Sequence, residues 1–202
     1  MELVNRARAA GATITHVEGE QLERALTTRT PQPIVAVAGS VSWSPAEVVV
    51  AAQASGLPVV VLAGVSDPGN AGTVIRSAVA AGAAGVLFTP GSVDPTNPKC
   101  VRASAGALFA LPVGAVDDLD VLRDLGLTTV GAAAGGAGPD DVDLSGPVAL
   151  VLGGEGSGLP EDQLVDEEVA LPLEGGVESL NVAMAGTVLL YEARRQRNGG
   201  RW

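Results

Sequence analysis

The chain has 202 residues, of which 47% are hydrophobic and 2% are aromatic, and its 12 basic and 23 acidic residues give a formal net charge of −11. This length suits one domain with a small appendage, and the acidic balance argues against generic binding of nucleic acid. The only histidine is His16 and the only cysteine is Cys100, which excludes an intrachain disulfide and a zinc cage, together with most metal and triad chemistry.

The first 40 residues are expected to form a partial α/β segment. Their patterns predict helices at 2–10 and 18–28, and strands at 12–17 and 34–38. The Ser- and Pro-containing stretch at 40–45 is typical of a linker, so we expect residues 41–57 to hold a linker and a first helix.

From residue 58 to the C-terminus, strand and helix patterns alternate. The predicted strands are 58–65, 85–88, 112–116, 128–134, 148–152 and 169–173. The predicted helices are 70–82, 99–109, 117–125, 159–167 and 179–197. Strands rich in Val, Ala and Leu without polar alternation are typical of a parallel sheet covered on both faces. We therefore expect an α/β fold whose main domain spans residues 58–202.

The chain carries no apolar run that approaches the length of a membrane span. Its N-terminus also lacks the basic-then-apolar pattern of a signal peptide. These two features predict a soluble cytoplasmic protein that has no membrane partner.

Polar residues occupy three short stretches next to predicted strands. These are Asn-Ala-Gly-Thr-Val-Ile-Arg at 70–76, Gly-Gly-Glu-Gly-Ser-Gly at 153–158 and Glu-Ser-Leu-Asn-Val-Ala at 178–183. In an open parallel sheet, ligands bind at the carboxyl ends of the strands. We therefore expect the three stretches to form one composite site.

Three familiar kinds of site fit the sequence poorly. The glycines at 154, 156 and 158 lack the spacing of a dinucleotide-binding turn, and the only lysine, Lys99, does not follow the glycine of a phosphate-binding loop. Ser104 half matches a nucleophile elbow, but Arg102 stands where its first glycine belongs, and His16 is far away in the sequence. What remains is a site built from Asn, Arg, Glu, Ser and backbone, which suits transfer of an already activated group by positioning.

Each polar residue also has a structural interpretation. Asn70 and Ser179 are good helix N-caps, and Glu155 can be a charge at the N-terminus of the helix predicted at 159. Asn181 would gain little in the first turn of a helix. Arg76 stands in a helix otherwise made of Ala, Val and Ile, which favours a functional or interface role.

Together these stretches resemble the SpoU-type ribose 2′-O-methyltransferases of the SPOUT superfamily across residues 57–197. The residues that match the first family motif are Asn70, Gly72, Arg76 and Ala78. The second motif is matched by Leu-Val-Leu-Gly at 150–153, Glu-Gly at 155–156 and Gly-Leu at 158–159, with Gly154 in place of the usual Asn. The third is matched by Leu-Pro-Leu at 171–173, a glycine at 175 or 176, and the stretch 178–183; residues 101–106 resemble the family's linking segment.

The resemblance implies a C-terminal trefoil knot, an exception to unknotted topology. It also implies a homodimer whose active site draws on both subunits, and S-adenosylmethionine held by loops at about 131–136, 152–157 and 171–183. The cofactor-binding residues that it implies are Gly131, Ala132, Ala133, Leu152, Gly153, Gly154, Gly156, Leu171, Leu173, Ser179, Leu180, Asn181 and Ala183.

The activity that the resemblance implies is methyl transfer to a ribose 2′-OH of structured RNA, either rRNA or tRNA, without a metal. Arg76 is then the residue expected to act on the acceptor, and the residues that orient it or the substrate are Asn70, Glu155, Ser179 and Asn181. Because arginine is effectively never deprotonated in proteins, Arg76 can serve as a phosphate ligand or alkoxide stabiliser instead of a base.

Two other functions stay open at this stage. One is a knotted cofactor-binding or interaction protein without catalysis, which the acidic charge and the short N-terminal segment favour. The other is a Rossmann-like nucleotide enzyme, which the glycine spacing disfavours. Residues 1–40 resemble the closing part of the RNA-binding domain that often precedes this family's catalytic domain, so that either the chain starts late or its substrate module is trimmed.

Overall fold

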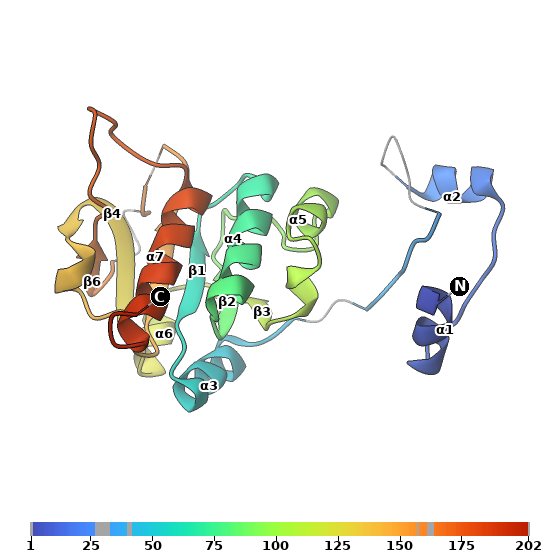
Figure 1. The fold of residues 1–202 in the computed structure, drawn as a ribbon, viewed down its shortest axis with the longest axis horizontal. Helices are drawn as coiled ribbons and strands as arrows, with labels where there is room; N and C mark the ends of the chain where they lie inside the picture. The colour runs from blue at the N-terminus through green and yellow to red at the C-terminus, as the bar shows by residue number, and fades with distance from the viewer. Residues whose placement is uncertain (1, 27–32, 40–41, 157, 161–163, 202) are drawn as a thin grey trace. The chain divides into compact units, whose positions relative to one another are not determined.

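The computed structural model of the chain describes residues 2–26, 33–39, 42–156, 158–160 and 164–201 (Figure 1). The chain divides into two compact units, residues 1–39 and residues 40–202. The candidate site lies in the second unit.

The second unit is built on a six-stranded sheet. Its strands are β1 (Val59–Ala63), β2 (Gly85–Phe88), β3 (Val113–Ala115), β4 (Thr129–Ala137), β5 (Ala149–Gly153) and β6 (Glu167–Val169). They lie in the order β3-β2-β1-β5-β4-β6, and every pair is parallel, which confirms the predicted parallel α/β fold. The carboxyl ends of the central strands β1 and β5 are level, because Ala63 pairs with Gly153.

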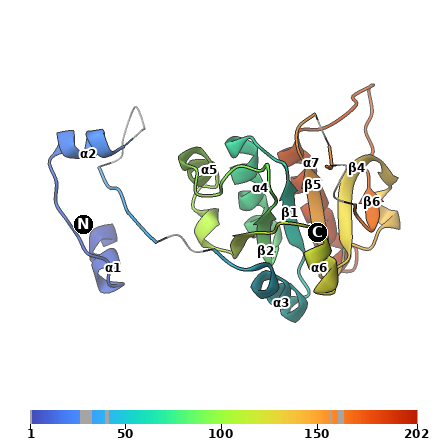
Figure 2. The same ribbon diagram turned by 180° about the vertical axis from the view of Figure 1, so that it is seen from behind.

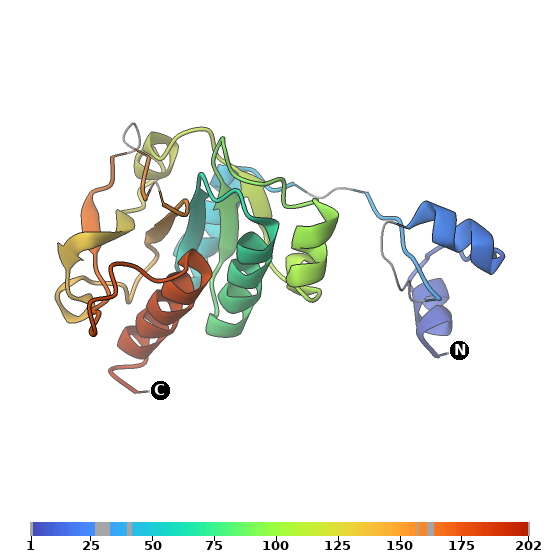
Figure 3. The same ribbon diagram turned by 90° about the horizontal axis from the view of Figure 1, so that it is seen from above.

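Helices cover both faces of this sheet (Figures 2 and 3). They are α3 (Pro45–Ser55), α4 (Pro68–Ala81), α5 (Pro98–Ala103), α6 (Asp120–Asp124) and α7 (Val182–Arg197), with the short 3₁₀ helices η1 (Ala107–Phe109) and η2 (Pro139–Asp141). Val60 and Leu62 of β1 pack in one core with α4 and α7, whereas Val59 and Val61 pack in a second core with α3 and α6. Successive side chains of a strand point to opposite faces, so β1 is buried on both sides.

The chain meets the sheet edge just before α3. The Trp43 N–H donates a hydrogen bond to the Val113 carbonyl at 3.1 Å, and Trp43 forms a single parallel bridge with Gly114 of the edge strand β3. A Cβ atom on Gly114 would overlap the Trp43 carbonyl oxygen, so this approach requires glycine. Residues 40–41 of the predicted linker lie outside the described residues.

The first unit contains α1 (Glu2–Ala9) and α2 (Gly19–Ala25), close to the predicted helices. Residues 27 and 28 of the second predicted helix lie outside the described residues. The strands predicted at 12–17 and 34–38 are wrong, because the residues described there form no strand. No side chain described in this unit is buried, so neither a core nor a ladder partner supports a strand there.

Several boundaries in the second unit also differ from the prediction. The helix predicted at 99–109 ends at Ala103 and is followed by η1, because Gly106 has φ 89° and Ala105 φ 50°. The described part of 159–167 is not helical, and residues 161–163 lie outside the described residues. The last strand is Glu167–Val169 instead of 169–173, and the terminal helix begins at Val182 instead of 179. None of the helices in the described part combines the length and apolar character needed to cross a membrane.

Candidate functional site

Three polar side chains from distant parts of the sequence meet beyond the carboxyl ends of the central strands β1 and β5. The Asn70 side-chain amide donates a hydrogen bond to the Glu155 carboxylate. The Asn181 amide in turn donates to the Asn70 side-chain oxygen at 3.1 Å. The structure thus joins one residue from each of the three polar stretches that the sequence singles out.

Asn70 lies in the first turn of α4 but does not cap it. The N-cap is Asp67, whose carboxylate accepts a hydrogen bond from the Asn70 N–H at 2.8 Å, and Pro68 occupies the first helical position. The capping role suggested for Asn70 is therefore wrong. Since Asp67 already serves the helix end, the Asn70 side chain is free to join the polar cluster.

Asn181 is the N-cap of α7. Its side-chain oxygen accepts hydrogen bonds from the N–H groups of Ala183 at 2.9 Å and Met184 at 3.3 Å. The expectation that Ser179 caps this helix is wrong, because the helix starts later. Asn181 therefore uses its oxygen for the helix and its amide group for Asn70, which fixes the side chain in one orientation.

Glu155 lies at the tip of a tight turn after β5. Gly154 and Gly158 form an antiparallel bridge, and the Gly158 N–H donates to the Gly154 carbonyl at 3.1 Å. A Cβ atom on Gly153 would overlap the Gly158 backbone, so the turn closes tightly over the end of β5. The structural interpretation of Glu155 as a helix N-terminal charge is not supported, since residues 158–160 and 164–166 are not helical.

Arg76 is exposed on the third turn of α4. Its guanidinium group forms no hydrogen bond or ion pair with any other described residue. The helix buries Val74, Ile75 and Ala78 around it, so the position holds an available cation on an otherwise well-packed element. Ser179 is exposed as well, and it lies apart from the hydrogen bonds of the polar cluster.

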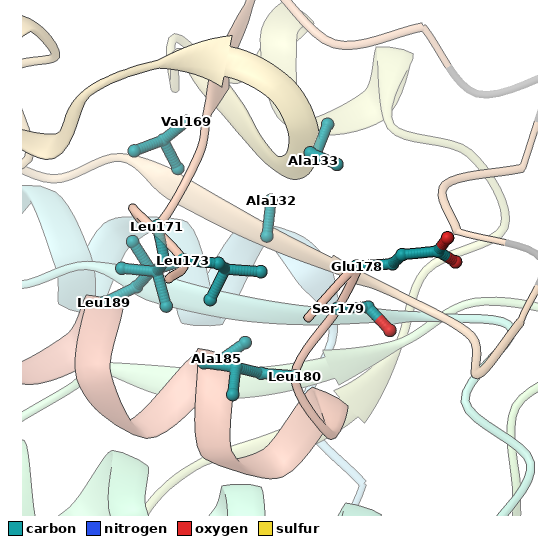
Figure 4. A pocket seen from close by; sticks show the side chains of 11 residues that line it. Ala132, Ala133, Val169, Leu171, Leu173, Glu178, Ser179, Leu180, Ala185 and Leu189 are labelled. Carbon is teal, nitrogen blue, oxygen red and sulfur yellow. The ribbon is translucent and has the colours of Figure 1, made fainter. Parts of the chain in front are cut away.

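An apolar pocket, here called the β4–α7 pocket, opens between β4, β6, the segment 171–180 and α7 (Figure 4). The residues that line it are Ala132, Ala133, Ala134, Val169, Leu171, Leu173, Glu178, Ser179, Leu180, Ala185 and Leu189. Figure 4 shows the side chains of Val169, Leu171, Leu173 and Leu189 gathered at one end, and the polar ends of Glu178 and Ser179 at the other.

The pocket takes in six of the residues that the sequence proposes for cofactor binding: Ala132, Ala133, Leu171, Leu173, Ser179 and Leu180. The other seven do not line it: Gly131, Leu152 and Ala183 are buried, Gly153, Gly154 and Gly156 belong to the turn after β5, and Asn181 belongs to the polar cluster. Ala134 and Glu178 lie within the loops expected at 131–136 and 171–183, whereas Val169, Ala185 and Leu189 lie outside every expected loop. The four-residue spacing of Ala185 and Leu189 on a helix was the available signal for two of these.

The chemistry of this pocket fits a ligand with both flat apolar and polar parts. Alanine and leucine side chains provide the apolar wall. Among the described residues, the backbone groups of 171–173 and 178–180 form no backbone hydrogen bond with one another or with the rest of the chain. Ligand sites commonly combine an apolar lining with a few polar groups of this kind.

Thiol and metal chemistry find no support in the described residues. Burial, with a smaller effect of Asp94, raises the pKa of the Cys100 thiol to about 11, so the group is protonated at neutral pH. No group of three or more His, Cys, Asp or Glu residues that could hold a metal ion occurs in the part of the chain that the structure describes.

Comparison with known proteins points to one family. The model of the SpoU rRNA Methylase family matches residues 58–191. A Synechocystis protein named as an uncharacterized tRNA/rRNA methyltransferase is 41% identical over 145 residues, which cover 68% of this chain and 53% of that protein. A Xanthomonas campestris 23S rRNA (guanosine-2′-O-)-methyltransferase is 39% identical over 209 residues, covering 98% of this chain and 84% of the relative.

Solved structures agree with the sequence relatives. The SpoU methyltransferase AviRb from Streptomyces viridochromogenes in complex with AdoMet has a TM-score of 0.64 and 37% identity, covering 71% of this chain and 61% of that one. The AdoMet-bound rRNA methyltransferase from Sinorhizobium meliloti has a TM-score of 0.65 and 36% identity, covering 70% of this chain and 57% of that one. The chain thus spans a little over half the length of several of these proteins.

Proposed function

The chain belongs to the SpoU rRNA Methylase family, and we propose that it transfers a methyl group from S-adenosylmethionine to a ribose 2′-OH of structured rRNA or tRNA. The observation that carries this proposal is the Asn70–Glu155–Asn181 cluster, which joins all three motif stretches at the edge of the sheet where ligands bind. The neighbouring β4–α7 pocket supplies a second, apolar site at the same edge.

The β4–α7 pocket is the proposed donor site. Two relatives of known structure carry AdoMet, and the alanine and leucine wall with free backbone groups suits an adenosyl group. When bound, S-adenosylmethionine supplies a methyl group that is already activated by its positive sulfur. The protein then needs only to hold the donor, orient the acceptor and stabilise charge.

Arg76 is the residue that we propose to act on the acceptor ribose. It is exposed and unpaired within the described residues, so its guanidinium group is available to a phosphate or to a developing alkoxide. We propose that Asn70, Glu155 and Asn181 hold the N-terminus of α4 in place, and that Ser179 contributes from the pocket wall. A fixed α4 would present Arg76 to the acceptor in one position.

The proposal extends to the assembly and the fold. It includes a homodimer that shares the active site, a cytoplasmic location where rRNA and tRNA are found, and the trefoil knot. The knot is supported by the strand order, in which β5 lies between β1 and β4 although it follows β4 in the chain. Residues 1–40 are proposed as part of an RNA-binding module, and residues 58–202 as the methyltransferase domain.

Calorimetry with S-adenosylmethionine and with NAD tests the donor site. We expect S-adenosylmethionine to bind and NAD to give no heat. Binding of NAD alone would favour a Rossmann-like nucleotide enzyme and would overturn the proposal.

A second experiment tests the reaction. The full chain is incubated with methyl-labelled S-adenosylmethionine and total RNA, and the labelled nucleotides are mapped as alkali-resistant linkages. We expect label at a 2′-O position in rRNA or tRNA. Binding of S-adenosylmethionine without label in any RNA would instead identify a catalytically silent, knotted cofactor-binding protein.

A further inference from the structure

One stretch of this acidic chain is locally basic. Between residues 68 and 116 the sequence contains three basic residues, Arg76, Lys99 and Arg102, and one acidic residue, Asp94. The whole chain has a net charge of −11. The stretch runs from α4 through α5 and η1 to the end of β3, so that its local charge is opposite in sign to that of the protein as a whole.

These three cations are also free. In the described part of the second unit, Arg123 and Arg195 pair with carboxylates, and Arg194 and Arg197 donate to the carbonyls of Ala80 and Ala81 at the end of α4. The side chains of Arg76, Lys99 and Arg102 are exposed and form no such bond with other described residues. No carboxylate or carbonyl group holds these three side chains, so they are available to a ligand with negative charge; Arg201 at the end of the chain is likewise exposed and without such a bond.

The two helices that carry the cations are in close contact. A Cβ atom on Gly72 of α4 would lie 2.5 Å from the Ala103 Cβ and 2.6 Å from the Cys100 carbonyl oxygen. Cys100 is fully buried, whereas its neighbours Lys99 and Arg102 face solvent. Because glycine lets α5 pack directly on α4, the exposed cations stand on two adjacent helices, whose outer surface is considered together.

An aromatic ring extends this surface. Phe109 of η1 is 75% exposed, more than any other described aromatic residue, and η1 contacts α4. Exposed rings beside cations are the combination that binds unpaired nucleotides, since the cations contact phosphates while the ring stacks on a base. We call the exposed side chains of Arg76, Lys99, Arg102 and Phe109 the α4–α5 surface.

We propose that the α4–α5 surface binds a single-stranded RNA segment next to the acceptor nucleotide, with Lys99 and Arg102 on phosphates and Phe109 stacked on an unpaired base. This inference rests on the proposed function, because it assigns the path of that same substrate. It explains how a protein with a net charge of −11 can bind RNA, because the electrostatic attraction of the phosphates is confined to the surface around Arg76.

The test measures RNA binding by filter assay, with a 23S rRNA transcript and bulk tRNA as probes and with S-adenosylhomocysteine present. The double variant Lys99→Gln/Arg102→Gln should bind more weakly and reduce the slope of log affinity against log salt by about 1.5, as expected for two lost phosphate contacts. Phe109→Ala should weaken binding roughly five- to 150-fold without changing that slope. Phe109→Tyr should restore binding because it keeps a ring for stacking.

Matched controls come from the same chain. Arg201→Gln removes an exposed arginine outside the surface, and Val50→Ala truncates a side chain on α3 that is 64% exposed. Both should bind RNA as the wild type does, and calorimetry should give every variant the wild-type affinity for S-adenosylmethionine.

The outcomes separate the two proposals. If the wild type methylates RNA while the double variant keeps both affinity and salt slope, the α4–α5 surface is not the RNA site and the proposed function stands. If the wild type neither binds nor methylates RNA, the proposed function fails and the inference fails with it. An effect of Arg201→Gln as large as that of the double variant would show that total charge, and not this surface, governs binding.

Discussion

The β4–α7 pocket and the α4–α5 surface lie on one domain but are built differently. Most of the pocket wall is made of alanine, valine and leucine side chains, of which Val169 and Leu189 are almost fully buried while Leu173 and Leu180 are partly exposed. The α4–α5 surface consists of three exposed, unpaired cations on α4 and α5 and the exposed ring of Phe109 on η1. A change in a buried lining residue such as Val169 or Leu189 should therefore disturb the fold and the proposed donor site together, whereas a change on the α4–α5 surface can alter binding of the acceptor RNA alone.

Arg76→Ala should have the largest effect on methyl transfer. It should show that the α4–α5 surface can be changed without changing the β4–α7 pocket. We expect methyl transfer to become undetectable, a loss of at least about 100-fold, because a group that stabilises transition-state charge is removed. The affinity for S-adenosylmethionine should stay close to that of the wild type. Turnover is measured with labelled cofactor and affinity by calorimetry. Arg76→Lys, which keeps the charge but not the planar fork, should recover only part of the rate. Normal turnover by Arg76→Ala would contradict the role assigned to this residue.

Gly136→Ala should damage the pocket side. A Cβ atom there would lie 2.6 Å from the Glu168 backbone carbon and 2.7 Å from the Val169 nitrogen, so β6 must shift away from β4. We expect the free energy of unfolding to fall by about 1–3 kcal/mol, and the affinity for S-adenosylmethionine to fall with it. Gly135→Ala is the matched control, because no atom lies within 4 Å of its added Cβ. Urea titration checks both, and equal stability of the two variants would argue against this packing.

Asn181→Ala tests the connection between α7, which lines the β4–α7 pocket, and α4, which carries Arg76. It removes the cap of α7 and the hydrogen bond to Asn70, so we expect a loss of about 1 kcal/mol in the free energy of unfolding. Ser179→Ala should change stability by less than about 0.5 kcal/mol, because Ser179 is exposed and caps no helix. The opposite order in thermal or urea unfolding would restore Ser179 as the cap.

Glu192→Gln should give the smallest effect, and only in its dependence on pH. Hydrogen bonds from Arg195 hold the pKa of the buried Glu192 carboxyl below its ordinary value of 4.5. A lowered pKa in the folded state adds stability above the ordinary pKa and loses it as the pH falls further. The stability difference between wild type and variant should therefore shrink as the pH falls below the ordinary pKa of 4.5, as followed by urea unfolding. If the stability difference does not change with pH, the hydrogen bonds between Arg195 and Glu192 do not lower the pKa of Glu192.

The sheet was predictable because its strands carry a strong signal. β1 and β5 are buried on both faces, so they appear in the sequence as unbroken runs of Val, Leu and Ala. The failures in the first unit have the opposite cause. A stretch such as 12–17 has strand-like composition, but a strand exists only through its partner, and the described residues provide none.

Within the site, polar residues were easier to find than apolar ones. Asn70, Glu155 and Asn181 stand out among small apolar neighbours, and the structure brings them together. Some local roles were mistaken, because Ser179 and Asn181 are both acceptable caps and only the start of α7 at Val182 decides between them. Ala185 and Leu189 were missed because an alanine or leucine on a helix looks the same whether it faces a core or a ligand.

The short outer strands of the sheet bear on how the protein behaves at high concentration. At one edge, Trp43 makes one hydrogen bond and a single parallel bridge to the three-residue strand β3. At the other edge, β6 is also three residues long and exposes two adjacent carboxylates, Glu167 and Glu168. Short, covered or charged edge strands hinder the pairing of one sheet with the edge of another. The described domain is thus protected against strand-to-strand aggregation, even though its core is rich in residues that favour β-structure.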